Sequence, residues 1–126
     1  MIRLLLPVPR WARAASFALL TLAAANAQSL LQKAPPKAAA RRGPYSTNVD
    51  AARAGSKLFA RHCAACHGAD RQGTGNSPPL PPALIRQAGD GAVFWVLTHG
   101  SRRHGMPSFA HLPEPQRWQI TAFLRE

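Results

Sequence analysis

Three stretches between residues 50 and 124 have the apolar spacing of short amphipathic helices. The first begins at Asp50, which can cap a helix, and ends near Gly68. Its apolar stripe consists of Ala51, Gly55, Leu58, Phe59 and His62. The second (AVFWVLTH) follows Asp90 as its N-cap and stops at Gly100, and the third covers about residues 113–124. The pattern predicts a small all-α fold of three or more short helices.

The connections between these helices carry strong turn signals. Residues 73–82 (GTGNSPPLPP) contain four prolines, which exclude regular helix, and residues 101–111 return to loop. A core built from three short helices and roughly 75 residues buries too little surface to be stable without a staple, a metal or a cofactor. We therefore expect a non-protein group to complete the centre of the fold.

Residues 1–27 have the features of a secretory signal peptide. Three arginines and no acidic residue come first, then an apolar run (AASFALLTLAAA), then the small-x-small site Ala25-Asn26-Ala27. The run is shorter than the about 20 residues that a membrane-spanning helix needs. We expect cleavage after Ala27, a periplasmic location and no spanning helix in the mature protein. Residues 28–49, which are basic and rich in Ala and Pro, are expected to form a flexible tether, and residues 50–126 the folded domain.

The chain is strongly basic, with 16 basic and five acidic side chains and a formal net charge of +11. Three basic residues and no acidic one lie in residues 1–27, so 13 basic and five acidic residues remain after cleavage, a formal charge of +8. Such a charge favours solubility and fits an acidic protein partner or an anionic membrane surface. Nucleic acid is not an expected partner, because the protein is predicted to be exported and its basic residues form no recognisable binding module.

Both cysteines of the chain lie in a CxxCH element at residues 63–67 (CAACH), the pattern of c-type haem attachment. Two thiols three positions apart can each add to a haem vinyl group, and the histidine that follows then reaches the iron. The alternatives are a redox-active CxxC, a simple disulfide and half of a zinc site. The first needs a βαβ context and the last a second ligand pair, and the sequence offers neither. We expect one covalent haem c per chain, attached through Cys63 and Cys66, with His67 as an axial iron ligand.

The second axial ligand is sought among the side chains with sulfur or imidazole donors, which are Met106, His62, His99, His104 and His111. Met1 is removed with the signal peptide, so Met106 is the only methionine of the mature chain. It lies between Gly105, which allows close backbone approach, and Pro107, which stiffens the loop. A lone methionine is more often a filler of the core. Its loop position downstream of CxxCH favours Met106 as the sixth ligand, with His104 as the main rival.

Together these motifs resemble the class I cytochrome c family, and more narrowly the monohaem domains attached to periplasmic dehydrogenases and terminal oxidases. The resemblance covers residues 50–126 and rests on GxxLFxxxCxxCHG at 55–68, FWVLTHG at 94–100 and GMPxF at 105–109. It implies three or more helices wrapped around the haem, with the first and last helix crossing each other.

The resemblance also implies roles for individual residues. A glycine permits the close crossing and an aromatic pair packs over it, and the matching positions are Gly55, and Phe59 with either Trp118 or Phe123. A proline carbonyl is implied to orient the proximal imidazole, and the candidates are Pro78, Pro79, Pro81 and Pro82. Trp95 is implied to line the haem crevice, with its indole N–H toward a propionate, although core packing explains it equally well.

An iron with both axial positions filled by protein has no vacancy for oxygen, peroxide or substrate. The sequence therefore predicts electron transfer and not catalysis, with a potential raised by the thioether ligand and by burial of the ring. We expect a single-electron carrier of an exported respiratory or dehydrogenase-linked chain, working between redox proteins with acidic docking surfaces. The rival hypotheses are a peroxidase-like haem enzyme or sensor with a labile sixth ligand, and a cytochrome subunit of a larger oxidoreductase.

Overall fold

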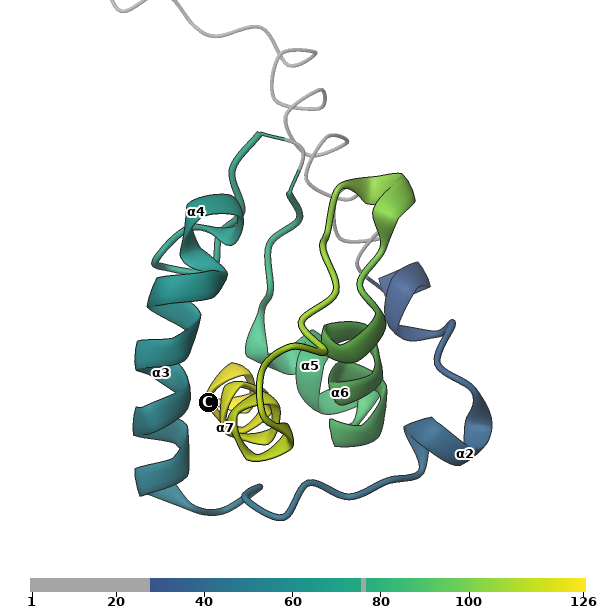
Figure 1. Cartoon of the computed structure of the whole chain (residues 1–126), viewed down its shortest axis with the longest axis vertical. Helices are drawn as coiled ribbons and strands as arrows, with labels where there is room; N and C mark the ends of the chain where they lie inside the picture. Colours follow the sequence, from purple (N-terminus) through teal and green to yellow (C-terminus); the bar gives the residue numbers. More distant parts are fainter. Residues whose placement is uncertain (1–27, 76) are drawn as a thin grey trace, which may run out of the picture.

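The structure is a computed structural model that describes residues 28–75 and 77–126 (Figure 1). The predicted signal peptide, residues 1–27, lies outside the described residues. The helices are α2 (Pro36–Ala39), α3 (Val49–His62), α4 (Ala64–His67), α5 (Pro82–Ala88), α6 (Asp90–His99), the 3-10 helix η1 (Arg102–His104) and α7 (Glu114–Arg125). Apart from isolated β-bridges, the described part of the chain contains no β-structure, so the all-α prediction is confirmed.

Helix α3 begins slightly earlier than its sequence predicts. The cap is Asn48, whose side-chain oxygen accepts a hydrogen bond of 2.9 Å from the backbone N–H of Ala51. Asp50 lies in the first turn instead, where its negative charge interacts favourably with the positive end of the helix dipole. The helical segment is interrupted at Cys63, which separates α3 from α4, and it ends at Gly68 as predicted. Cys63 therefore lies at the break between the two helices, and Cys66 lies on α4.

Helices α3 and α7 cross at a steep angle, since α3 lies in the plane of Figure 1 while α7 is seen nearly end-on. The crossing requires a glycine, because a Cβ atom built at Gly55 would lie 1.9 Å from the carbonyl oxygen of Gln119. Phe59 packs next to it against Phe123, with ring centroids 5.3 Å apart. The close crossing implied by the resemblance is therefore present, and Phe123 is the aromatic partner of Phe59.

Helix α6 is buried along most of its length, as its continuous apolar run predicts. Gly100 ends it with a positive φ of 66°, but its N-cap is Gly89, so Asp90 lies in the first turn and does not cap the helix. Trp118 on α7 stacks on Phe94 of α6 with ring centroids 3.9 Å apart, which explains why Trp118 is not the partner of Phe59. Helices α6 and α7 are thus fixed to each other by an aromatic pair of their own.

The proline-rich loop is followed directly by a helix that the sequence pattern did not predict. Residues 77–81 are irregular, as expected, but α5 begins at Pro82. Proline is tolerated in the first turn of a helix because the N–H that it lacks has no partner inside the helix there. Ile85, on α5, is almost fully buried and joins the central apolar cluster.

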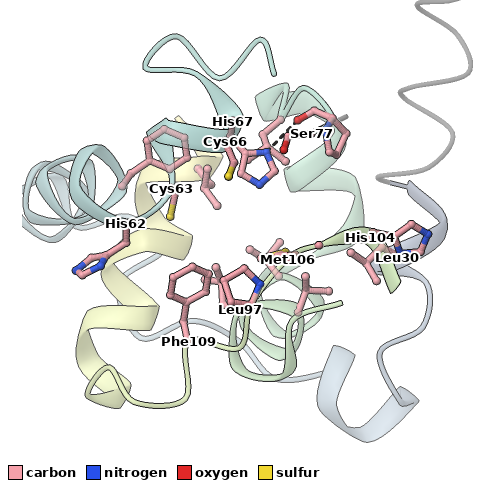
Figure 2. Close-up of a pocket in the computed structure, with 18 of the residues that line it drawn as sticks. Leu30, His62, Cys63, Cys66, His67, Ser77, Leu97, His104, Met106 and Phe109 are labelled. Atoms are coloured by element: carbon pink, nitrogen blue, oxygen red, sulfur yellow. Dashed lines mark hydrogen bonds between the residues drawn. The ribbon is translucent and has the colours of Figure 1, made fainter. Parts of the chain in front are cut away.

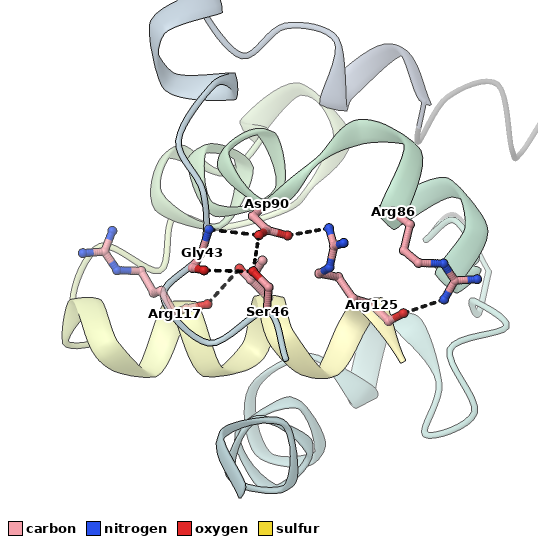
Figure 3. Close-up of polar contacts among 7 residues, drawn as sticks. Gly43, Ser46, Arg86, Asp90, Arg117 and Arg125 are labelled. Atoms are coloured by element: carbon pink, nitrogen blue, oxygen red, sulfur yellow. Dashed lines mark hydrogen bonds and ion pairs between the residues drawn. The ribbon is translucent and has the colours of Figure 1, made fainter. Parts of the chain in front are cut away.

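Residues 28–49 differ from the flexible tether that their composition predicts. Residues 28–31 are helical, α2 packs against α6, and Leu31 and Ala34 are buried. The backbone N–H of Gly43 and the hydroxyl of Ser46 both donate to the carboxylate of Asp90 (Figure 3). Composition missed this because the contacts involve few apolar residues and depend on partners distant in the sequence. Among the described residues, no helix is long and apolar enough to span a bilayer.

Candidate functional site

A cavity of about 410 Å³ lies between the end of α3, helix α4, helix α6 and the loops on either side (Figure 2). This volume is within the usual range for cofactor and ligand sites. Its walls are mostly apolar, and they include Phe59, Ile85, Val93, Val96, Leu97 and Phe109. The side chains with sulfur or imidazole groups lie at its two ends, so the apolar walls separate two sets of donors.

Cys63 and Cys66 line one end of the cavity as free thiols, with no disulfide between them. Cys63 is buried, and its thiol has a pKa raised to about 11. The main cause is burial, which disfavours the charged thiolate, and the charge of the neighbouring Cys66 is a smaller cause. A redox-active CxxC needs the opposite shift, toward a thiolate at neutral pH. Among the described residues, no cluster of three or more His, Cys, Asp and Glu side chains is placed to hold a metal ion. The thiols remain available for covalent attachment.

His67 is oriented by a backbone carbonyl. Its Nδ1–H donates to the carbonyl oxygen of Pro78 over 3.0 Å, so Pro78 is the member of the proline loop that makes this contact. The hydrogen bond places the proton on Nδ1 and leaves Nε2 free to bind a metal. Figure 2 shows the ring of His67 directed into the cavity. The end of the cavity with the thiols therefore also presents an imidazole in the tautomer that an iron requires.

Met106 lies at the opposite end of the cavity, facing His67 across it (Figure 2). Its loop is closed by two backbone hydrogen bonds, from the Ser101 N–H to the Met106 carbonyl (2.8 Å) and from the Met106 N–H to the Ser101 carbonyl (3.1 Å). Gly105 makes the turn in the left-handed conformation, with φ 76°. His104 also borders the cavity, but it is exposed and its Nδ1 is engaged with the Ser101 hydroxyl at 2.7 Å. Met106 is partly buried and faces His67 across the cavity, whereas His104 is exposed, and this difference favours the Met106 thioether as the donor opposite His67.

The residues around the cavity fit a covalently attached, two-ligand haem, with two free thiols, a preset imidazole, an opposing thioether and apolar walls. A family model described as cytochrome c oxidase, cbb3-type, subunit III matches residues 50–124. The chain belongs to this cytochrome c family. Membership implies a covalent haem c and a role in electron transfer. A comparison with curated proteins finds no match.

Trp95 of this cytochrome does not line the cavity, although the resemblance implied a contact with the haem. It is partly buried on α6 and stacks on His99, with ring centroids 4.6 Å apart. The side chains of α6 that do reach the cavity are Val93, Val96 and Leu97. Helical spacing places Trp95 on a different face from these three, so the structure favours the packing interpretation of Trp95.

Of the other histidines that the sequence offered as candidate ligands, two lie on the surface, away from the cavity. His99 is exposed and its Nδ1 contacts the Trp95 carbonyl at 2.9 Å, and His111 is exposed near Phe109. His62 is the exception, because it is partly buried and borders the cavity beside Phe109. Its position one residue before Cys63 makes it a wall residue on the attachment side, opposite the end where Met106 lies.

Sequence reasoning missed two wall residues of the cytochrome, Leu30 and Leu31. They lie outside the matched range, in the segment expected to be a tether. The only signal for them in the sequence is a pair of adjacent leucines in a stretch that is otherwise polar or small. A pair this short has no periodicity, so no burial could be predicted from it.

Proposed function

We propose that this cytochrome is a single-electron carrier whose haem is bound covalently by Cys63 and Cys66 and whose iron is held by His67 and Met106. The observation that carries the proposal is the arrangement of His67 and Met106 at opposite ends of one apolar cavity, with both thiols beside His67. The bound haem supplies a reversible one-electron couple. The protein attaches it, holds both axial positions and limits the access of water.

The proposal favours transfer over catalysis because both donors are held by the backbone around them. His67 is held by the Pro78 carbonyl, and Met106 lies in a loop closed by the paired hydrogen bonds with Ser101. A thioether ligand stabilises ferrous iron and so raises the potential, and the apolar walls act in the same direction. With neither position vacant, exogenous ligands have no ready site on the iron.

We propose that the partners are redox proteins with acidic surfaces and that docking occurs beside the Met106 loop. Arg102 and Arg103 are exposed on η1, directly before the cavity residues His104 to Met106. Neither makes an ion pair with another residue that the structure describes. In contrast, Asp50, Asp90 and Glu114 each pair with an arginine elsewhere on the molecule. Two unpaired arginines at the cavity edge create a local positive potential that favours an acidic partner.

Export to the periplasm is part of the proposal and rests on the signal-like features of residues 1–27 together with the haem-attachment element.

A second functional assignment differs only in how permanent the complex with the partner is. The matched family is described as a subunit of a cbb3-type oxidase, which favours a dedicated subunit of a larger oxidoreductase as the alternative to a freely diffusing carrier.

The deciding experiment replaces Met106 with alanine in the haem-loaded protein, with His104→Ala as the matched control from the same loop. The unmodified protein and the control should be low-spin, show the weak ferric absorption of a sulfur–iron bond, and resist carbon monoxide in the ferrous state. Met106→Ala should lose that absorption, bind carbon monoxide rapidly and have a lower potential. Rapid carbon monoxide binding by the unmodified protein would instead favour an enzyme or a sensor. Absence of the sulfur–iron absorption in the unmodified protein, with carbon monoxide binding gained in His104→Ala and not in Met106→Ala, would make His104 the ligand.

A further inference from the structure

The segment that precedes the matched cytochrome domain contributes to the haem cavity. The family match begins at residue 50, yet Leu30 and Leu31 are among the residues that line the cavity. Leu31 is only 9 % exposed and belongs to the central apolar cluster, and Leu30 packs against that cluster. The wall therefore includes side chains outside the part of the chain that the family accounts for.

The first attachment of this segment is to the start of α6. A Cβ atom built at Gly91 would lie 2.2 Å from the carbonyl oxygen of Ala38 and 2.7 Å from that of Ala39, so the backbone of α2 rests directly on α6. Such an approach is available only to glycine. This contact fixes the position of α2 along the axis of α6. It thereby also restricts where the preceding residues 30–31 can lie.

The second attachment is the carboxylate of Asp90, which is buried and reaches across from α6 (Figure 3). It accepts hydrogen bonds from the Gly43 N–H (2.9 Å) and the Ser46 hydroxyl (2.6 Å), and it pairs with Arg125 of α7 over 2.5 Å. Hydrogen bonds to a charged acceptor are among the stronger ones in proteins. One carboxylate thus joins the segment to both α6 and α7.

The third attachment is Arg41, whose guanidinium lies over the stacked rings of Phe94 and Trp118, 4.9 Å and 5.1 Å from their centroids. The same guanidinium donates to Glu114 over 2.9 Å, and Glu114 also accepts from the Trp118 indole N–H. Both hydrogen bonds lower the pKa of Glu114, and the one from Trp118 has the larger effect. The segment is held at three separate points, so its position does not depend on the leucines alone.

We propose that residues 28–49 form a strap that closes the haem site on the side of the Met106 loop, with Leu30 and Leu31 as its positioning residues. The two leucines line the cavity together with His104, Gly105 and Met106 of that loop. They exclude water beside the thioether and restrict the loop from swinging away. This inference rests on the proposed ligation of the haem iron by Met106.

The test compares the haem-loaded double variant Leu30→Ser/Leu31→Ser with the unmodified protein. The matched control is Gln32→Ser/Lys33→Ser, which changes two exposed neighbours in the same segment. Intact mass verifies that all three proteins carry one haem and begin at the same residue. The measurements are the rate at which azide or imidazole binds the ferric iron, the midpoint potential, and hydrogen exchange of the Met106 loop and of residues 36–46.

Replacement of the buried Leu31 and the partly buried Leu30 by serine should expose the loop and raise the population of the open site. The ligand-binding rate should rise with it, on the order of tenfold or more. The potential should fall and exchange in the Met106 loop should increase, while residues 36–46 keep their protection because the three attachments remain. The control should match the unmodified protein. Equal ligand-binding rates and potentials in all three proteins would overturn the strap.

The two proposals fail in different ways. If the unmodified protein already binds azide rapidly or is high-spin, the ligation by Met106 fails, whatever the leucine variant does. If the unmodified protein is closed and low-spin and the leucine variant behaves identically, only the strap fails. Rapid hydrogen exchange across residues 36–46 in the unmodified protein would also overturn the strap, because it would show that the segment is not held against the domain.

Discussion

The substitution Gly55→Ala tests the helix crossing on which the whole fold depends. Its Cβ would lie 1.9 Å from the Gln119 carbonyl oxygen and 2.5 Å from the carbonyl carbon, whereas real Cβ contacts do not fall below 3.0 Å. The oxygen must therefore retreat by at least 1.1 Å, the difference between 3.0 Å and 1.9 Å. The clashing atoms belong to the backbone of α7, so a rotamer change cannot relieve the overlap and the helices must move apart.

The expected cost follows from three contributions. Overpacking in a core costs about 1–3 kcal/mol, and an immovable backbone partner places Gly55→Ala near the upper end. Separation of the helices also weakens the Phe59–Phe123 pair, which is worth about 0.5–1.5 kcal/mol. The higher helix propensity of alanine offsets up to about 1 kcal/mol. We expect a net loss of about 2–3 kcal/mol in the free energy of unfolding.

The assay is guanidinium-induced unfolding of the haem-loaded protein, followed by circular dichroism, with the midpoint compared at an unchanged slope. Ala60→Gly is the matched control, because Ala60 is exposed on the same helix and its replacement costs only the propensity difference of about 1 kcal/mol. A Gly55→Ala protein that is as stable as the unmodified one, or more stable by the propensity gain, would refute the close crossing.

Three further predictions concern attachment, docking and the polar contacts of the strap. Intact mass of protein matured with haem-attachment machinery should give one haem per chain starting at Gln28, and free thiols or a disulfide at Cys63 and Cys66 would contradict the attachment. Reversing Arg102 and Arg103 to glutamate should slow electron exchange with an acidic partner at low salt and flatten its dependence on ionic strength, because exposed charges are screened beyond about 10 Å at 0.1 M. Asp90→Asn should cost about 2–3 kcal/mol in unfolding free energy, because Arg125 loses its partner and the Gly43 and Ser46 donors share a weaker acceptor.

The controls for these predictions come from the same chain. Lys57→Glu/Arg42→Glu makes the same change in net charge at exposed positions that do not line the cavity, and it should alter exchange less than the η1 reversal does. Equal effects of the two reversals would mean that overall charge, and not η1, guides docking. An Asp90→Asn protein with unchanged stability and unchanged hydrogen exchange at Gly43 would show that the carboxylate contributes nothing to holding the strap.

The parts of the structure that could be predicted from sequence are those fixed by local spacing. Three of these features depend only on neighbours within a few residues: the spacing of CxxCH, the Gly-Met-Pro loop and the apolar runs. The family match over residues 50–124 agrees with the interpretation of these motifs. Gly100 ended its helix as predicted, because a positive φ is a local requirement that glycine meets.

The parts that could not be predicted depend on distant partners. Asp90 looked like a helix cap, but its carboxylate is taken by Gly43 and Ser46, more than 40 residues earlier in the chain. Trp95 looked equally suited to the cavity and to packing, and only the rotation of α6 decided between them. Leu30 and Leu31 looked unstructured, because the surface that covers them is formed by elements that follow much later.

The paired backbone hydrogen bonds between Ser101 and Met106 have a consequence for the speed of each electron transfer. A thioether that binds both ferric and ferrous iron must keep nearly the same position when the iron changes its charge. A loop closed at both ends by its own backbone allows the sulfur little travel, so few atoms have to rearrange as the electron arrives or leaves. Under the proposed ligation by Met106, the iron site therefore needs little rearrangement to accept or release an electron.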